Sequence, residues 1–320
     1  MRILSGIQPS GTLHIGNYLG MIKPMVESQS RGDLFCFIAN MHCLTRVFDA
    51  KKVANYTREA ILDLLALGID PERSVFWVQS DVPEVAELTW YLNNVTTVGL
   101  LERCHSYKDA LAKGMPPSNG LFSYPVLMAA DILMYQSNIV PVGKDQKQHV
   151  EVARDIALRF NSTYGETFVI PEPEIVDDLA VIPGIDGQKM SKSYNNTIEI
   201  FGEEKALKKK VMSILTDPTP VEAPKDPDKS IVYALYRLFA DSAEAESMAG
   251  KFRAGGYGYG EAKKELFIVL WEYFKPYREK REELVKDPGV VERIRARGAQ
   301  KARAIATQTL RRVRELVGVV

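Results

Sequence analysis

The sequence predicts an α/β protein: a Rossmann-like, doubly wound parallel sheet with a helical insertion, followed by an all-helical domain. Over the first 185 residues, short apolar runs of strand length alternate with longer amphipathic runs of helical period. After Ser193 this alternation stops, and helical patterns follow one another to the end. A chain of 320 residues that is 46% hydrophobic and 26% charged is large enough for two such parts of a soluble protein.

The expected strands are short, and most are rich in Val, Ile and Phe; they are residues 3–6, 34–39, 74–79, 139–142 and 167–170. The helices expected between them are residues 16–28, 51–67, 86–93, 124–135 and 145–160. Strands that alternate with crossover helices pair in parallel, which predicts the doubly wound sheet. Residues 82–123 contain no convincing strand, so we expect a helical insertion between two halves of the sheet.

The second part begins after a stiff connector, residues 217–228, which contains four prolines. The helices expected beyond it are residues 231–240, 244–252, 260–285 and about 288–316. A glycine cluster at 255–260 has the look of a nucleotide-binding loop, but no strand precedes it, which favours a helix-breaking turn.

The charge distribution and the cysteine content limit the classes of function that are possible. Eight Lys and Arg against two Glu give the last 30 residues a charge of +6, which indicates a polyanionic partner or, alternatively, a solvated helix face. Three cysteines without a C-x-x-C pair exclude a disulfide framework and a zinc ribbon. With no secretory signal and no run of apolar residues that would span a membrane, we expect a cytoplasmic protein.

The first candidate site follows the first strand, at residues 6–17. Three glycines there permit close backbone approach, and the start of the next helix offers free N–H groups to an anion. His14 and Asn17, three residues apart, can both donate to a phosphate oxygen. Alternatively, His14 is only part of a helix-capping turn.

Two further segments have phosphate- or nucleotide-binding character. Gly143 follows the fourth strand, and Asp145 there either accepts from a ribose hydroxyl or simply caps a helix. Lys189 and Lys192 flank small residues in a glycine- and proline-rich stretch. Two flexible point charges suit a pyrophosphate that moves during a reaction, although an ordinary solvated loop would also explain a lysine.

An aspartate interrupts a nearly all-apolar helix at residues 124–135. Buried and unpaired, Asp131 would cost several kcal/mol by order of magnitude, so it needs a donor. That donor is either a structural partner, such as an arginine or a backbone cap, or the single N–H of an indole ring. Met128 lies on the same helix face and can pack against such a ring.

In order along the chain, His-Ile-Gly-Asn at 14–17 and Lys-Met-Ser-Lys-Ser at 189–193 resemble the paired signatures of class I aminoacyl-tRNA synthetases. Residues 5–11, 128–133 and 142–149 extend the resemblance to the bacterial-type tryptophanyl family, over almost the whole chain. Asn17 stands where the class signature usually has His, a replacement that this family commonly shows, and Lys144 stands where an acidic residue is frequent.

The resemblance implies a two-step ligase of protein biosynthesis: tryptophan and ATP, with Mg²⁺, give tryptophanyl-adenylate, and the acyl group then passes to tRNA(Trp). It implies catalytic roles for His14, Asn17, Lys189 and Lys192, and no metal site on the protein. The implied ATP-binding residues are Gln8, Pro9, Ser10, Gly16, Asn17, Gly143, Lys144, Asp145, Val181, Lys189, Met190, Ser191, Lys192 and Ser193. The implied tryptophan-binding residues are Asp131, Met128, Leu4, Ile132, Val140, Val142, His42, Tyr124 and Gln146.

By the same resemblance, residues 1–185 are the catalytic domain, with the insertion at 82–123 as the interface of a homodimer. Residues 186–196 form the loop that we call the KMSKS loop, residues 197–287 bind tRNA and its anticodon, and residues 288–320 form a basic C-terminal helix. Three alternatives remain: a tyrosine enzyme of the same class, a small nucleotidyltransferase, and a synthetase paralogue kept as a binding module. The Asp131 helix favours tryptophan over tyrosine, the helical half disfavours a nucleotidyltransferase, and the intact His14 and lysines disfavour an inactive paralogue.

Overall fold

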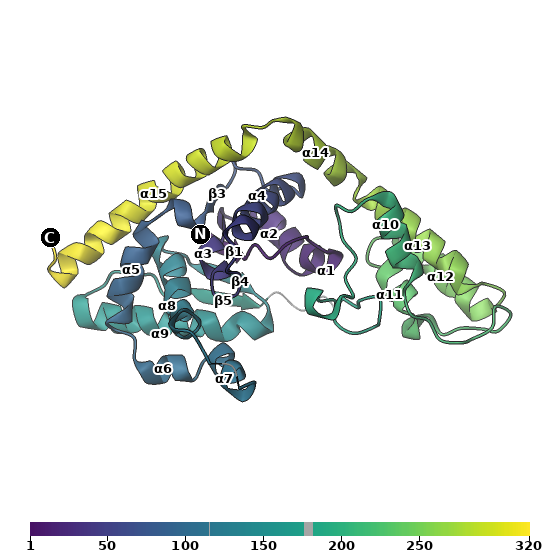
Figure 1. The fold of residues 1–320 in the computed structure, drawn as a ribbon, viewed down its shortest axis with the longest axis horizontal. Helices are drawn as coiled ribbons and strands as arrows, with labels where there is room; N and C mark the ends of the chain where they lie inside the picture. The colour runs from purple at the N-terminus through teal and green to yellow at the C-terminus, as the bar shows by residue number, and fades with distance from the viewer. Residues whose placement is uncertain (115, 176–181) are drawn as a thin grey trace. The chain divides into compact units, whose positions relative to one another are not determined.

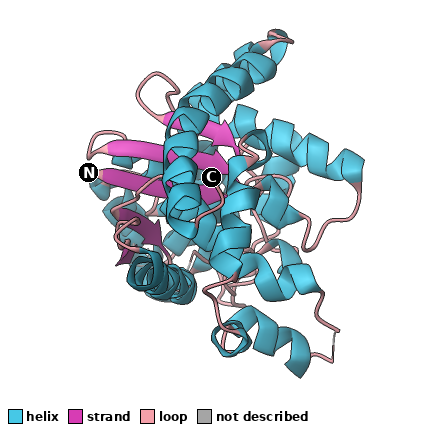
Figure 2. Ribbon diagram, turned by 90° about the vertical axis from the view of Figure 1, so that its left-hand side faces the viewer, coloured by secondary structure: helices cyan, strands magenta, loops and turns pink. Residues whose placement is uncertain are grey.

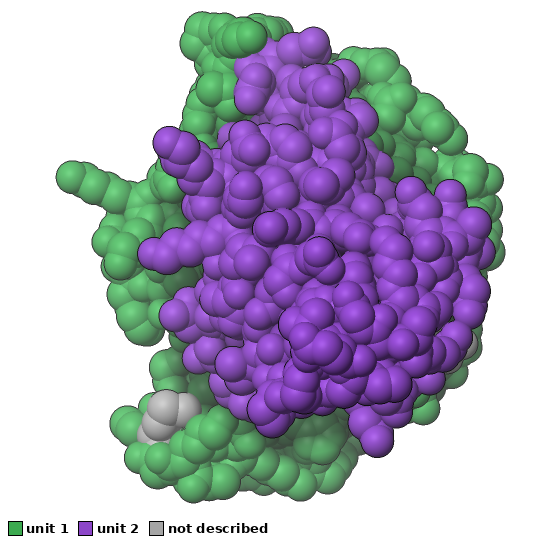
Figure 3. Space-filling model, turned by 90° about the vertical axis from the view of Figure 1, so that its right-hand side faces the viewer, with its two compact units in different colours: residues 1–11, 21–177, 284–320 green, residues 12–20, 178–283 purple. Residues whose placement is uncertain are grey.

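The computed structural model describes residues 1–114, 116–175 and 182–320. The chain divides into two compact units (Figure 3): residues 1–11, 21–177 and 284–320 form unit 1, and residues 12–20 and 178–283 form unit 2. Both units are therefore discontinuous in sequence. The short segment 12–20, which carries His14 and Asn17, groups with unit 2, whereas the last helix groups with unit 1.

Unit 1 contains a five-stranded, all-parallel sheet of order β3-β2-β1-β4-β5. The strands are β1 (Arg2–Ile7), β2 (Asp33–Ile38), β3 (Val75–Val78), β4 (Ile139–Val142) and β5 (Glu172–Ile175). This order confirms the doubly wound fold. The sheet grows from β1 toward β2 and β3 on one side and toward β4 and β5 on the other, so the switch point lies between β1 and β4. Ligands of such sheets bind beyond the carboxyl ends of the strands at that switch point.

Helices lie in front of and behind the strands (Figure 2), and their labels can be followed in Figure 1. They are α2 (Lys23–Ser28), α3 (Asn40–Cys43), α4 (Ala50–Ala66), α5 (Glu84–Asn93), α6 (Val98–Glu102), α7 (His105–Ala112), α8 (Asn119–Met134), α9 (Lys147–Tyr164) and α15 (Val290–Val317), with 3-10 turns η2 (Gln79–Asp81) and η3 (Lys144–Gln146). Within the described residues, 82–123 contain helices and no strand, as expected. Helix α8 begins five residues before the expected start, because Ser118 caps it and Pro125 is tolerated inside it.

The fifth strand was predicted at the wrong place: residues 167–170 are not a strand, and β5 lies at 172–175. Side chains satisfy the backbone of 167–169 instead, because Asn161 accepts from the N–H groups of Thr167 and Phe168, and Gln136 accepts from that of Val169. Pro173 and the glutamates on either side of it hide the true strand, since charged residues and proline are depleted in strands and only Ile175 is apolar.

Helix α15 packs along β3 and α5 (Figure 1). A Cβ placed on Gly298 would lie 1.9 Å from the carbonyl oxygen of Phe76, so only glycine permits this close approach to β3. Six of the eight basic residues after 290 form ion pairs with carboxylates: Arg293, Arg295, Arg297, Arg303, Arg311 and Arg314. Much of the positive charge that suggested a polyanionic partner is therefore neutralised within the chain.

Unit 2 is mainly helical. Its elements are α1 (Ile15–Asn17), η4 (Lys192–Tyr194), α10 (Glu204–Met212), η5 (Pro227–Lys229), α11 (Ile231–Tyr236), α12 (Ser242–Ala254) and α13 (Tyr259–Tyr273). Helix α13 packs against α10 and α11 around buried Leu235, Leu266 and Leu270. Gly255 and Gly256, with φ of 77° and 76°, end α12, which confirms the helix-breaking turn.

Three expected helices differ from those found. The helix expected at 16–28 is interrupted by a π-helical turn, η1 (Tyr18–Ile22), before α2. The helix expected at 231–240 ends at Tyr236, and the one expected at 260–285 is two helices, α13 and α14 (Lys275–Lys286). Pro276 explains the last break, since proline fits the first turn of a helix better than its interior. No helix of the described residues is long and apolar enough to cross a membrane.

Candidate active site

His14 and Asn17 form a reciprocal capping box at the start of α1. The Asn17 N–H donates to His14 Nδ1, and the His14 N–H donates to Asn17 Oδ1, each at 3.3 Å. His14 therefore caps the helix, and the two capping hydrogen bonds fix both side chains. Because Nδ1 accepts, the proton of the neutral imidazole is on Nε2, and the Asn17 amide keeps its Nδ2 donors.

The His14 imidazole is neutral at physiological pH. Burial, with a further contribution from the positive charge of Lys192, lowers its pKa from 6.5 to about 4. A neutral imidazole with a fixed tautomer acts as a directed hydrogen-bond donor through Nε2, without the desolvation cost of a buried charge.

The KMSKS loop is organised around Asn196, which is 1% exposed. Its Oδ1 accepts from the N–H of Ser191 at 2.7 Å, and its Nδ2 donates to Asp186 Oδ1 at 2.8 Å and to the carbonyl of Lys189 at 3.1 Å. The side chain fits under Gly184, where a Cβ would lie 2.3 Å from it. One buried amide thus holds the backbone at Lys189 and Ser191, while the side chains of both lysines are exposed.

The two signatures lie together in unit 2. The backbone of Leu13 and Ile15 pairs with the segment just after the loop: the Ile15 N–H donates to the Ile198 carbonyl, and the Ile200 N–H to the Leu13 carbonyl. A Cβ on Gly16 would lie 3.0 Å from His14 Nδ1 and 3.5 Å from Met190 Cβ, so glycine makes room where the segments meet.

The other residues expected at ATP lie in unit 1, after β1 and after β4. Pro9 is buried, Gln8 and Ser10 are exposed, and the Pro9 carbonyl accepts from Cys43 Sγ of α3 at 3.2 Å. Gly143 directly follows β4, and Lys144 and Asp145 open η3. β1 and β4 are the neighbouring strands of the switch point. Val181 lies outside the described residues.

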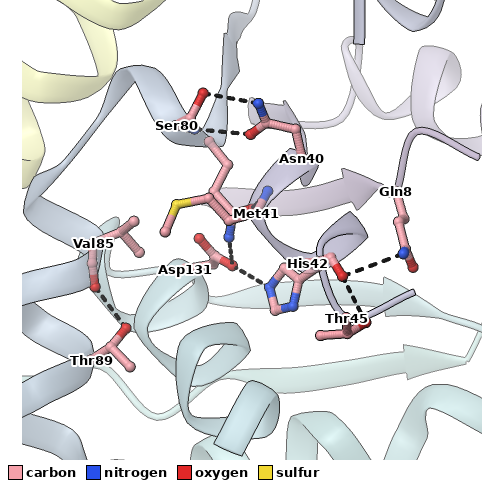
Figure 4. A network of polar contacts seen from close by, with 10 residues as sticks. Gln8, Asn40, Met41, His42, Thr45, Ser80, Val85, Thr89 and Asp131 are labelled. Carbon is pink, nitrogen blue, oxygen red and sulfur yellow. Dashed lines mark hydrogen bonds and ion pairs between the residues drawn. The ribbon is translucent and has the colours of Figure 1, made fainter. Parts of the chain in front are cut away.

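Asp131 is buried at 2% exposure on α8 and is held from two other elements. Its Oδ2 accepts from His42 Nε2 at 2.9 Å and from Gln79 Nε2 at 2.8 Å (Figure 4 shows the contact with His42). Burial raises the pKa of Asp131, and the bonds from His42 and Gln79 counter that rise. Since both bonds use one carboxylate oxygen, the other is left for a further donor.

The remaining residues expected at tryptophan lie in unit 1 but do not form a single group. Tyr124 stacks edge-on to His42, with ring centroids 6.1 Å apart, and its hydroxyl contacts His149 and Ser106. Leu4, Ile132 and Val140 belong to the fully buried core, Met128 and Val142 are half-buried against it, and Gln146 is exposed.

Sequence reasoning missed Gln79 and Asn196. Gln79 is 1% exposed, and its Oε1 accepts from the Met41 N–H at 3.0 Å, so its Nε2 must face Asp131. A polar residue directly after an apolar strand was the available signal for Gln79. Asn196 lay in a polar loop, where nothing in the sequence marks one amide as buried.

Known proteins resemble this chain over its full length. The profile of the family "tRNA synthetases class I (W and Y)" matches residues 1–275. The tryptophan–tRNA ligase of Fusobacterium nucleatum is 55% identical, with 100% of this chain and 98% of the relative covered, and that of Rhodopirellula baltica is 53% identical, with 100% of both covered. The crystal structure of tryptophanyl-tRNA synthetase from Campylobacter jejuni, complexed with ADP and tryptophan, superposes with a TM-score of 0.95 at 51% identity, covering 99% of this chain and 100% of that one. The chain therefore belongs to the class I tRNA synthetases, in their tryptophan–tRNA ligase branch.

Proposed function

We propose that the protein activates L-tryptophan with ATP and transfers it to tRNA(Trp), with Asp131 selecting the amino acid and the two signatures of unit 2 binding the phosphates. The observation that carries the proposal is the environment of Asp131: a buried carboxylate with both donors on one oxygen, on an otherwise apolar helix. An aminoacyl-tRNA synthetase whose relatives are tryptophan–tRNA ligases needs one such acceptor.

Selection rests on the polarity of the indole ring. Indole has one N–H donor and no acceptor, and Asp131 Oδ1 supplies the acceptor. Met128 and Tyr124 pack against the ring, with Leu4, Ile132, Val140 and Val142 forming the apolar wall behind them. His42 and Gln146 hold the ammonium and carboxylate groups of the substrate.

Activation is an in-line displacement at the α-phosphorus. A carboxylate oxygen of tryptophan forms a bond to phosphorus, and the bond to the bridging oxygen breaks, so pyrophosphate leaves with the electron pair. No general base is needed, because the amino acid arrives ionised. Negative charge grows on the phosphate oxygens, and fixed donors stabilise it: His14 Nε2–H and Asn17 Nδ2–H, with Lys189 and Lys192 on the departing pyrophosphate.

The nucleotide contacts the residues after β1 and β4, namely Gln8, Pro9, Ser10, Gly143, Lys144 and Asp145, together with Gly16, Met190, Ser191 and Ser193; Val181 is assigned to the adenine. The side chains that meet the phosphates are donors and not metal ligands, so Mg²⁺ is part of the substrate, MgATP. Magnesium keeps most of its waters and takes its other ligands from the phosphates.

The transfer step needs a surface for tRNA. We assign it to residues 197–287, where helix α10 exposes Lys205, Lys208 and Lys209 to solvent. The catalytic domain is residues 1–185, the KMSKS loop is residues 186–196, and residues 288–320 are the C-terminal helix.

Two copies of the chain form a dimer through residues 82–123. The enzyme works in the cytoplasm, a reducing compartment in keeping with three buried, free cysteines.

Amino-acid-dependent ATP–pyrophosphate exchange tests the proposal. The wild type should prefer tryptophan over phenylalanine roughly 10⁴-fold or more, because a site built around a polar partner rejects analogues that lack it. Asp131→Ala should abolish most of that preference and leave the KM for ATP nearly unchanged. The exposed Asp155 on α9, changed to Ala, is the control. A wild type that prefers tyrosine would overturn the function, and a variant that still prefers tryptophan would overturn the role of Asp131.

A further inference from the structure

The turn η2, directly after β3, is held by three different elements through its three side chains. Gln79 lies between the Met41 N–H and Asp131. Ser80 exchanges two hydrogen bonds with Asn40 of α3: its N–H donates to Asn40 Oδ1 at 3.1 Å, and the Asn40 amide donates to its hydroxyl at 2.9 Å (Figure 4). Asp81 is held by Arg295 of α15.

The Arg295–Asp81 pair has the geometry of a strong contact. Arg295 Nε donates to Asp81 Oδ2 at 2.9 Å, and Nη2 donates to Oδ1 at 2.6 Å. The Asp81 side chain is only 18% exposed. Bidentate, partly buried pairs of this kind fix orientation, whereas exposed single contacts do so weakly.

The position of Asp81 constrains Gln79. The Val82 N–H donates to the Gln79 carbonyl at 3.1 Å and closes the turn, so the two side chains belong to one rigid unit of three residues. Among the described residues, Asp131 is the hydrogen-bond partner of Gln79 Nε2, and Gln79 is only 1% exposed, so the bond is largely shielded from water. A shift of the turn therefore changes the donor that steadies Asp131.

We propose that Arg295 is a positioning residue for tryptophan: its ion pair with Asp81 fixes the turn that presents Gln79 to Asp131. The inference rests on the proposed role of Asp131 and adds to it a contact from the last helix of the chain. Arg295 itself does not touch Asp131 or Gln79; it acts through the backbone of η2.

Helix α15 supplies a matched control. Arg303 pairs with Glu84 through Nε at 2.8 Å, and Glu84 is also largely buried, with its side chain 11% exposed. Glu84 belongs to the first turn of α5 and not to η2. Losing either pair weakens the docking of α15 in a similar way, but only the loss of Arg295 releases the turn behind Asp131.

The experiment compares full-length Arg295→Gln and Arg303→Gln in ATP–pyrophosphate exchange and in direct tryptophan titration, with thermal unfolding alongside. We expect both variants to lose Tm, and only Arg295→Gln to raise the KM and Kd for tryptophan, by roughly threefold to thirtyfold. Its KM for ATP should stay within about twofold of wild type, and Asp81→Asn should add little to the effect of Arg295→Gln, because both remove the same contact. Equal tryptophan KM values in the two variants, or a parallel rise in the KM for ATP, would overturn the inference.

Amide hydrogen exchange separates failure of this inference from failure of the proposed function. The N–H of Val82 should exchange faster in Arg295→Gln than in Arg303→Gln, whichever amino acid the enzyme activates. Equal exchange in the two variants would overturn the inference on its own. A wild type that does not activate tryptophan would overturn the proposed function and leave the exchange result to decide whether Arg295 fixes the turn.

Discussion

At His14 the backbone decides which nitrogen of the imidazole carries the proton. The N–H of Asn17 occupies Nδ1, and burial keeps the ring neutral, so Nε2–H is the only donor left to meet a phosphate. Helix capping by Nδ1 therefore leaves Nε2 for the phosphate contact that we propose. Because the ring is neutral, it does not repel the positive charge of Lys192.

The raised pKa of Asp131 predicts an acid limb in the activity profile. The ionised carboxylate is a much stronger acceptor for the indole N–H than the neutral acid, so kcat/KM for tryptophan should fall as the pH drops through the raised pKa, at a pH above that of an ordinary aspartate. The folded state holds this proton more tightly than the unfolded chain, so Asp131 should also lower stability as the pH rises through the same window.

His42→Gln tests the origin of that limb. The contact from His42 lowers the pKa of Asp131, so removing it should move the limb to higher pH in profiles of kcat/KM for tryptophan. Disappearance of the limb in this variant would show that the limb does not come from Asp131 alone. An unmoved limb would show that His42 does not influence the ionisation of Asp131.

For single residues, the sequence predicted which side chains are polar site candidates better than it predicted their hydrogen-bond partners. It placed an acceptor at Asp131, because a single carboxylate in an apolar helix stands out, and donors at His14 and Asn17, because the start of a helix is a local pattern. It could not supply Gln79 or His42 as the partners of Asp131, since they lie 52 and 89 residues away in sequence. Contacts over such distances depend on strand order, which no local pattern encodes.

Among the elements, the contrast between β3 and β5 shows where sequence patterns succeed. β3 lies at one edge of the sheet, but it is short, apolar and largely buried against α15, and its expected range of 74–79 contains the observed one. β5 lies at the other edge and has the sequence Glu-Pro-Glu-Ile; it was missed because it is charged, contains proline and is only partly buried, so it lacks the apolar run that marks β3. The four largely apolar strands, β3 at the edge among them, were predictable, and the charged strand β5 was not.

The close approach of α15 to β3 predicts a large effect from one methyl group. Gly298→Ala should destabilise the protein by about 1–3 kcal/mol, because the new Cβ would overlap the Phe76 carbonyl and push the helix away. Gly250→Ala is the control: it lies in α12 with nothing within 4 Å of a Cβ, and alanine there should stabilise the helix by about 0.5–1 kcal/mol. Urea unfolding measures both, and a neutral Gly298→Ala would mean that α15 does not need this contact distance.

For the whole molecule, the proposed dimer is the feature most open to test. The segment 82–123 exposes Trp90 at 68%, Val98 at 62% and Leu111 at 52%, although large apolar side chains are costly to leave in water. Trp90→Glu should shift the sedimentation of the protein from dimer to monomer, while Ile268→Glu, an equally drastic change at an exposed site on α13, should not. A monomeric wild type, or a Trp90→Glu variant that still sediments as a dimer, would contradict the proposal.

The sequence predicted a sheet-containing part and a helical part, but not that the C-terminal helix returns to the sheet-containing part. A basic segment after 290 suggested an external partner, and only the structure shows most of its arginines paired with carboxylates of the chain itself. Charge patterns give the sign of a partner and not its location, so the sequence left open whether these arginines meet an external polyanion or carboxylates of the same chain.

The return of α15 to β3 also sets an order of events during translation. Arg295 follows Asp81 by 214 residues, which at ribosomal speeds of about 5–20 residues per second takes about 10–40 s. Throughout that interval the nascent chain carries β3 and η2 without the helix that covers them, so an apolar surface is bare while synthesis continues. Arg295, the proposed support of the turn behind Asp131, is thus made long after the residues that it holds.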